Sequence, residues 1–72
     1  MRLIYPRLSA NQHHIVAYIH DNPGCTQGQI IDALPIAGAV VAWALDRLIR
    51  RGIVADRGSN RCQLYLPMET EQ

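Results

Sequence analysis

The chain has 72 residues, 49% of them apolar, so we expect one folded domain with a small core and not a disordered chain. No apolar run is long enough to span a bilayer and no signal-peptide pattern opens the chain, which predicts a cytoplasmic protein without a membrane partner. A formal net charge of +1 excludes a strongly basic nucleic-acid binder, but five of the seven basic side chains, all arginines, lie between residues 47 and 61.

Residues 1–8 form a predicted extended N-terminal arm, because the proline within it disfavours helical backbone at the residue before it. Ser9 and Gln12 then fit a capping box, in which a hydroxyl and a glutamine three residues later satisfy backbone N–H groups at a helix start. The first helix is therefore predicted to run from about residue 10 to residue 20. The turn-forming run Asp21–Gly24 ends it.

Thr26 and Gln29 repeat the capping box and predict a second helix, which a proline stops after about residue 34. A third helix, Ala37–Arg51, follows after a tight turn. Gly52 comes directly after it and is the residue type that can adopt the left-handed backbone conformation closing a helix. A short helix, a tight turn and a longer helix make up the helix-turn-helix arrangement.

The third helix is amphipathic, with an apolar stripe at helical spacing on one side. Its opposite side carries a tryptophan and arginines that a core does not require, so we expect function on that side. The predicted core of the whole domain comprises Ile15, Val16, Ile19, Ile30, Ile31, Leu34, Val41, Leu45, Leu48, Ile53 and Leu64.

A β-hairpin is predicted after the third helix. Ile53–Ala55 is apolar and Cys62–Leu66 alternates in polarity, which is typical of two short strands. The polar, turn-rich run Asp56–Arg61 separates them, with the expected tip at Gly58–Asn60. Residues 67–72 are a predicted polar tail.

Three helices followed by a hairpin resemble the winged helix-turn-helix domain of bacterial and phage transcriptional regulators, an α+β fold, over residues 9–66. Leu45–Val54 is similar to the end of the recognition helix in MarR-type regulators, and Asn22–Ile31 to the link into their second helix. The resemblance implies that the third helix enters the major groove of double-stranded DNA and that loop 56–61 is the wing. The residues it places at DNA are Ala39, Val40, Trp43, Arg47, Arg50, Arg51, Arg57 and Arg61.

Two functional hypotheses follow. The first is a sequence-specific DNA-binding regulator of bacterial, phage or plasmid origin, in which guanidinium groups contact phosphates. The second is a protein-interaction module of the same fold, because Ala39, Val40 and Ala42 occupy turns where base edges are usually read through hydrogen bonds. Trp43 could contact a thymine methyl or pack over Arg47, anchor a protein partner, or lie partly buried under the wing.

The sequence also bears on oligomeric state. The additional dimerisation helices of MarR-type proteins have no counterpart here, so a homodimer would use the arm, the first helix or the tail.

The remaining polar side chains indicate neither an enzyme, nor a cofactor, nor a metal site. Cys25 and Cys62 lack zinc-ligand spacing, and His13 and His20 are two helical turns apart. In winged helices the link before the second helix lies beside the last strand, so we expect the two thiols to be neighbours and reduced. Two small buried apolar residues are the preferred interpretation, and a redox switch is the alternative.

Overall fold

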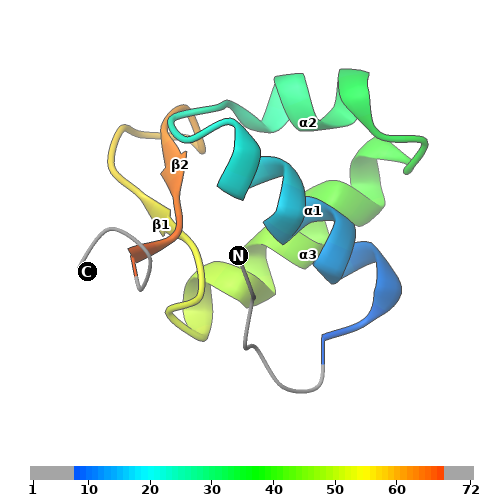
Figure 1. Cartoon of the computed structure of the whole chain (residues 1–72), viewed down its shortest axis with the longest axis horizontal. Coiled ribbons are helices and arrows are strands. Elements are labelled where there is room, and N and C mark those ends of the chain that lie inside the picture. The colour runs from blue at the N-terminus through cyan, green and yellow to red at the C-terminus, as the bar shows by residue number, and fades with distance from the viewer. Residues whose placement is uncertain (1–7, 68–72) are drawn as a thin grey trace.

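The computed structural model describes residues 8–67, so the predictions of an arm over residues 1–8 and a tail over 67–72 fall almost wholly outside the described range. Three helices pack around one core, with α1 crossing in front of α3 and a hairpin beside them (Figure 1). The order of elements is the predicted α+β order. The elements are α1 Ala10–Asp21, α2 Gln27–Ala33, α3 Gly38–Arg50, β1 Ala55–Asp56 and β2 Leu64–Tyr65.

Both predicted capping boxes are present. The backbone N–H of Gln12 donates to the Ser9 hydroxyl at 3.2 Å, and the Ser9 N–H donates back to the Gln12 side-chain oxygen at 3.0 Å. The same reciprocal pair joins Thr26 and Gln29 at the start of α2, at 3.0 and 2.9 Å. Because each box satisfies two backbone donors that a helix start leaves unpaired, it determines where the helix begins.

The ends of α1 and α3 use glycine as predicted. Gly24 has a φ of +85° after α1 and Gly52 has a φ of +76° after α3, values in the left-handed region that residues with a Cβ rarely adopt. A Cβ at Gly24 would also lie 3.0 Å from the Tyr65 hydroxyl oxygen. Glycine is therefore the residue that lets the chain reverse at both places with the least backbone strain.

The core joins all three helices to the hairpin, and nine of the predicted core residues are buried in it. Ile31 and Leu34 are only partly buried, because the short α2 buries Ile30 alone. The predicted core lacked Ala44, Val54 and Leu66, which are also buried, and Cys25 is buried as we expected of the cysteines.

The hairpin strands are shorter than predicted. Ala55 pairs with Tyr65 and Asp56 with Leu64 in an antiparallel register. The backbone N–H groups of Ile53 and Val54 both donate to the Leu48 carbonyl oxygen, at 3.0 and 3.3 Å, so these residues form the turn that closes α3, and the first strand begins only at Ala55.

The link between α1 and α2 lies beside β2, as predicted. The Gly24 N–H donates to the Leu64 carbonyl oxygen at 2.8 Å, and the Leu64 N–H donates to the Cys25 carbonyl oxygen at 2.9 Å. This extra bridge gives β2 a partner on its second edge and fixes the hairpin against the helices.

The tight turn of the wing overlaps the predicted tip at Asn60 and extends one residue beyond it, to Arg61. The Cys62 N–H donates to the Ser59 carbonyl oxygen at 3.1 Å, and the two residues between them, Asn60 and Arg61, have φ values of +52° and +60°. Positive φ at both central residues is typical of the tight turns that match strand twist. Asparagine tolerates this conformation better than arginine does, so tertiary contacts have to hold Arg61 there.

Candidate nucleic-acid interface

The outward side of α3 carries an exposed apolar surface among charged side chains. Trp43 is 60% exposed and Val40 is 37% exposed, and they are the large apolar side chains of the described chain that lie in solvent. Ala39 beside them is also exposed. The other side of the same helix contributes Val41, Ala44, Leu45 and Leu48 to the core, so helical periodicity forces residues between these positions outward.

Arg47 stacks on Trp43. The guanidinium carbon of Arg47 lies 4.5 Å from the centre of the Trp43 ring, within the range of a cation–π contact. Trp43 therefore packs against the Arg47 side chain, which was one of the predicted positions, and it is not buried under the wing. The stacking holds a flat cation against a flat ring on the surface, so both groups present one continuous face.

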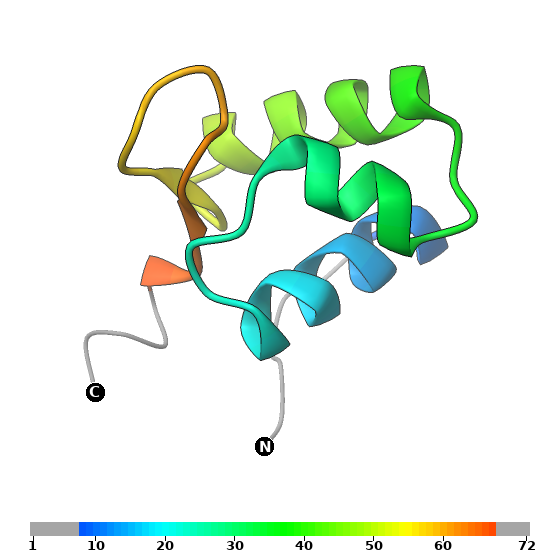
Figure 2. The same ribbon diagram turned by 90° about the horizontal axis from the view of Figure 1, so that it is seen from above.

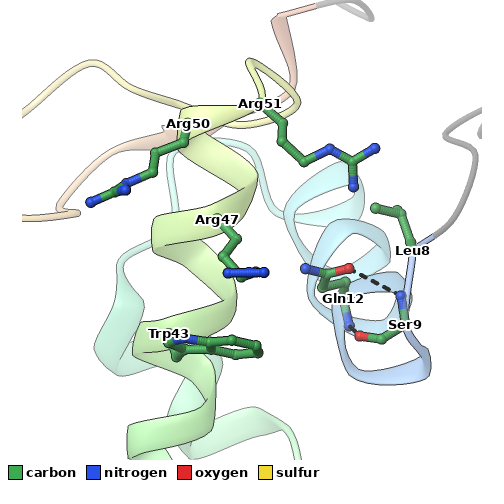
Figure 3. A pocket seen from close by; sticks show the side chains of 7 residues that line it. All are labelled: Leu8, Ser9, Gln12, Trp43, Arg47, Arg50 and Arg51. Carbon is green, nitrogen blue, oxygen red and sulfur yellow. Dashed lines mark hydrogen bonds between the residues drawn. The ribbon is translucent and has the colours of Figure 1, made fainter.

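This face forms one wall of an open groove of about 640 Å³ between α3 and the start of α1. Figure 3 shows Trp43, Arg47 and Arg51 pointing toward α1, whereas Arg50 points away from it. None of the groove's lining residues is acidic, so the groove favours a negatively charged occupant. The α1 wall consists of Leu8, Ser9 and Gln12.

The α1 wall was not predicted as part of a site. Gln12 is 8% exposed and its side-chain oxygen is engaged in the capping box, so the capping pattern explained it fully. Its place in the wall of the groove depends on the way α1 packs on α3, and the local sequence contains no signal for that packing.

Asp46 lies between the helix and the wing. Its carboxylate accepts from Arg50 Nε at 3.1 Å, one turn along α3, and lies 3.6 Å from Arg61 Nη2 in the hairpin loop. Nothing in the sequence distinguishes this aspartate from an ordinary residue of a helix surface. The structure instead makes it the charged contact between α3 and the loop, which Figure 2 shows beside the end of the helix.

The two wing arginines are placed differently. Arg57 is exposed, and its guanidinium carbon lies 5.2 Å from the centre of the Tyr65 ring. The Arg61 side chain is 32% exposed and turns toward Asp46, and its Nε is buried without a hydrogen-bond partner among the described residues. The wing therefore presents Arg57 outward and uses Arg61 against the helix.

The cysteines do not form a buried pair. Cys25 is buried and Cys62 is exposed, so the prediction that both are buried is wrong for Cys62, which the turn at residues 59–62 carries to the surface. Both are free thiols. Burial raises the pKa of the Cys25 thiol, which disfavours the reactive thiolate.

The His, Cys, Asp and Glu side chains of residues 8–67 form no group of three that could hold a metal ion. In the same range, no helix has the length and apolarity to cross a membrane.

Three helices followed by a two-stranded hairpin, with one side of the third helix exposed, define a winged helix-turn-helix domain. A family model described as MarR family matches residues 8–61, and the chain belongs to that family. No curated protein and no solved structure matches the chain. Family membership makes this a domain of the winged-helix transcriptional regulator class, whose members bind DNA.

Proposed function

We propose that this protein is a sequence-specific regulator that binds double-stranded DNA with α3 in the major groove and the hairpin wing on the backbone. The observation that carries the proposal is the exposed, stacked pair of Trp43 and Arg47 on the outward side of α3. The proposed DNA contacts are Ala39, Val40, Trp43, Arg47, Arg50, Arg51 and Arg57, and Arg61 completes the proposed interface where the wing packs on α3.

This surface offers two kinds of contact to DNA, one charged and one apolar. Arg47 and its neighbours present planar guanidinium groups that pair with phosphate oxygens through two hydrogen bonds each. Trp43, Val40 and Ala39 offer apolar contacts, which suit the methyl group of thymine and the sugar edges. Affinity is therefore expected to come mainly from released counterions, and sequence preference from apolar contact and from DNA shape.

The wing completes this interface. Arg57 is exposed on the loop and stacked on Tyr65, so its charge is held at the edge of the hairpin. A wing arginine in this place suits a backbone phosphate or the minor groove beside the site of α3.

We further propose that the protein acts in the bacterial cytoplasm and that its active form is a homodimer. Its gene would be bacterial, or would come from a phage or a plasmid. A dimer would read two half-sites about one turn of the double helix apart. Sedimentation of the free protein and of its complex tests the oligomeric state. We assign no catalytic activity and no cofactor to the domain.

Selection from random duplexes at low and moderate salt tests the proposal directly. The wild type should enrich one sequence, and Arg47→Ala should weaken binding to selected and random duplexes while reducing the salt slope by roughly 0.9, as one lost phosphate contact does. Arg47→Lys is the matched control, since it keeps the charge and loses the fork and most of the stacking, so its slope should stay near that of the wild type. Failure to bind any duplex would contradict the proposal.

Trp43 gives an optical test because it is the chain's single tryptophan. Its exposure predicts emission typical of a water-exposed indole in the free protein, with a shift on adding the selected duplex. An emission maximum that does not respond to duplex would remove Trp43 from the DNA interface.

A protein-interaction module is the second candidate, and the adjoining exposed side chains Trp43 and Val40 favour it. Exposed tryptophan is a common anchor of protein interfaces, and the arginines around the groove would favour a partner segment that combines an apolar side chain with carboxylates. In that case Trp43→Ala should weaken partner binding by about 2 kcal/mol, whereas duplex binding of the wild type should be weak and without sequence preference.

A further inference from the structure

Asp46 is the one acidic residue of α3, and it lies on the side of the helix that we propose to face DNA. Its carboxylate accepts from Arg50 Nε at 3.1 Å and lies 3.6 Å from Arg61 Nη2. A carboxylate repels DNA phosphates, so its presence here weakens the attraction that the surrounding arginines create. These two contacts indicate a structural role for the carboxylate.

Arg61 is fixed at the junction of the wing with two helices. Its N–H donates to the Asp56 carboxylate at 2.6 Å, and its carbonyl oxygen accepts from the Gln27 N–H at 3.0 Å. Its backbone also has the positive φ that disfavours residues with a Cβ. The Arg61 backbone therefore cannot move without disturbing the hairpin turn and the start of α2.

The Arg61 side chain is directed toward α3. Nε is buried and unpaired among the described residues, and Nη2 is directed at Asp46. A guanidinium in this position has Asp46 as the carboxylate that compensates its charge. A DNA phosphate that approached Nη2 would compete with that carboxylate.

Arg50 differs from Arg61 in being 78% exposed. It is free to reach a phosphate by rotating about its side-chain bonds, but in the free protein its Nε is paired with Asp46, one turn away. Aspartate four residues before arginine is the favourable order for such a pair on a helix. Asp46 thus neutralises one mobile arginine of α3 and holds one fixed arginine of the wing.

We propose that Asp46 determines how strongly this domain discriminates between DNA sequences, by masking Arg50 and by holding the wing in register with α3 through Arg61. The proposal rests on the DNA-binding function proposed above. Binding to a preferred sequence needs α3 and the wing in a fixed relation, whereas binding to random DNA needs only available positive charge. Removing the carboxylate should therefore help random binding and not help selected binding. Arg61 is then a positioning residue and not a phosphate contact.

Asp46→Asn tests this, with Asp21→Asn as the charge-matched control, because Asp21 is exposed at the end of α1 and away from the interface residues. Asp46→Asn should raise affinity for a random duplex roughly tenfold at low salt and steepen its salt slope by about 0.9, the value for one additional phosphate contact. The ratio of selected to random affinity should fall. Asp46→Glu, which keeps a carboxylate on the same helical face, should restore most of that ratio.

A cycle with Arg50 identifies the source of the effect. In the wild type, Arg50→Ala should reduce the salt slope by less than the contribution of one phosphate contact, because Arg50 Nε is already paired with Asp46. In the Asp46→Asn background, the same Arg50→Ala change should remove the whole added slope. Arg61→Ala should lower the selected-to-random ratio without reducing the slope for random DNA. Circular dichroism melting shows that each variant is folded.

The outcomes separate this inference from the function on which it rests. A wild type that binds no duplex contradicts both. A wild type that binds a selected sequence, together with an Asp46→Asn variant whose slope and ratio match those of Asp21→Asn, contradicts the role of Asp46 alone. A reduced slope in Arg61→Ala would likewise show that Arg61 contacts phosphate and is not a positioning residue.

Discussion

In the helical bundle the elements are held together by aliphatic side chains that solvent does not reach, whereas the wing loop is held by single polar atoms. Ile15, Leu45 and Leu48 are completely buried between the helices. The loop depends on the Asp56 carboxylate, which accepts from the Gly58 and Arg61 N–H groups at 3.2 and 2.6 Å, and on Asp46. A surface built on both regions therefore joins a rigid helix to a loop that one polar substitution can loosen.

Leu45→Ala should have the largest effect on stability. Leu45 is fully buried in the centre of α3, and large-to-small changes of this kind cost about 2–5 kcal/mol. That loss is comparable with the whole stability of a small domain. Trp43→Ala, on the exposed side of the same helix, is the control and should melt like the wild type. If Leu45→Ala and Trp43→Ala have the same melting temperature, the buried and exposed sides of α3 contribute equally to stability, which would contradict this prediction.

Asp56→Ala should cost less, about 1–3 kcal/mol, because two backbone donors lose a charged acceptor. The loss should be confined to the wing. Amide exchange should quicken at Arg61 and in β2, while the amides of α1 keep their protection. Asp56→Asn, which retains one oxygen acceptor, should fall between Asp56→Ala and the wild type. Uniform loss of protection across the bundle would show that the wing and the bundle are one cooperative unit.

Thr26→Ala should cost about 1 kcal/mol, the usual effect of losing a helix cap. The hydroxyl accepts from the Gln29 N–H at the start of α2, a helix too short to form without its packing and its cap. Thr26→Ser keeps the hydroxyl and should restore the unfolding midpoint in urea. A Thr26→Ala variant as stable as wild type would mean that the core contact of Ile30 alone sets this helix.

The smallest effect should come from the Cys25 thiol at alkaline pH. Burial raises its pKa in the folded state, so the folded protein holds this proton more tightly than the unfolded chain does. The stability from this group is complete below the pKa of the thiol in the unfolded chain and is lost as the pH rises through the higher folded value.

Urea unfolding at a series of pH values under reducing conditions measures this dependence. Cys25→Ala should flatten the decline, and Cys62→Ala should leave it unchanged because that thiol is already exposed. An equal decline in all three proteins would assign it to other groups.

Local patterns in the sequence were sufficient to predict the helices and which side of α3 is exposed. Ser9, Thr26 and Gly52 act within one helical turn of the backbone groups they satisfy, so their spacing predicted the helix starts and the end of α3. The two faces of α3 followed from the 3.6-residue period, which is why the exposure of Trp43 and Arg47 could be expected. The sequence by itself determined these features because the interacting groups are neighbours along the chain.

Only the tertiary structure decided which distant groups meet. Asp46 and Arg61 are joined by the way the loop folds back on α3, and the groove beside Trp43 exists because of how α1 lies against that helix. The exposure of Cys62 depends in the same way on the turn at residues 59–62. Such contacts depend on packing angles and on the register of β2, which no spacing within a single element encodes. For this reason an aspartate that belongs to an ordinary helix surface in the sequence becomes, in the folded protein, the link between α3 and the hairpin loop.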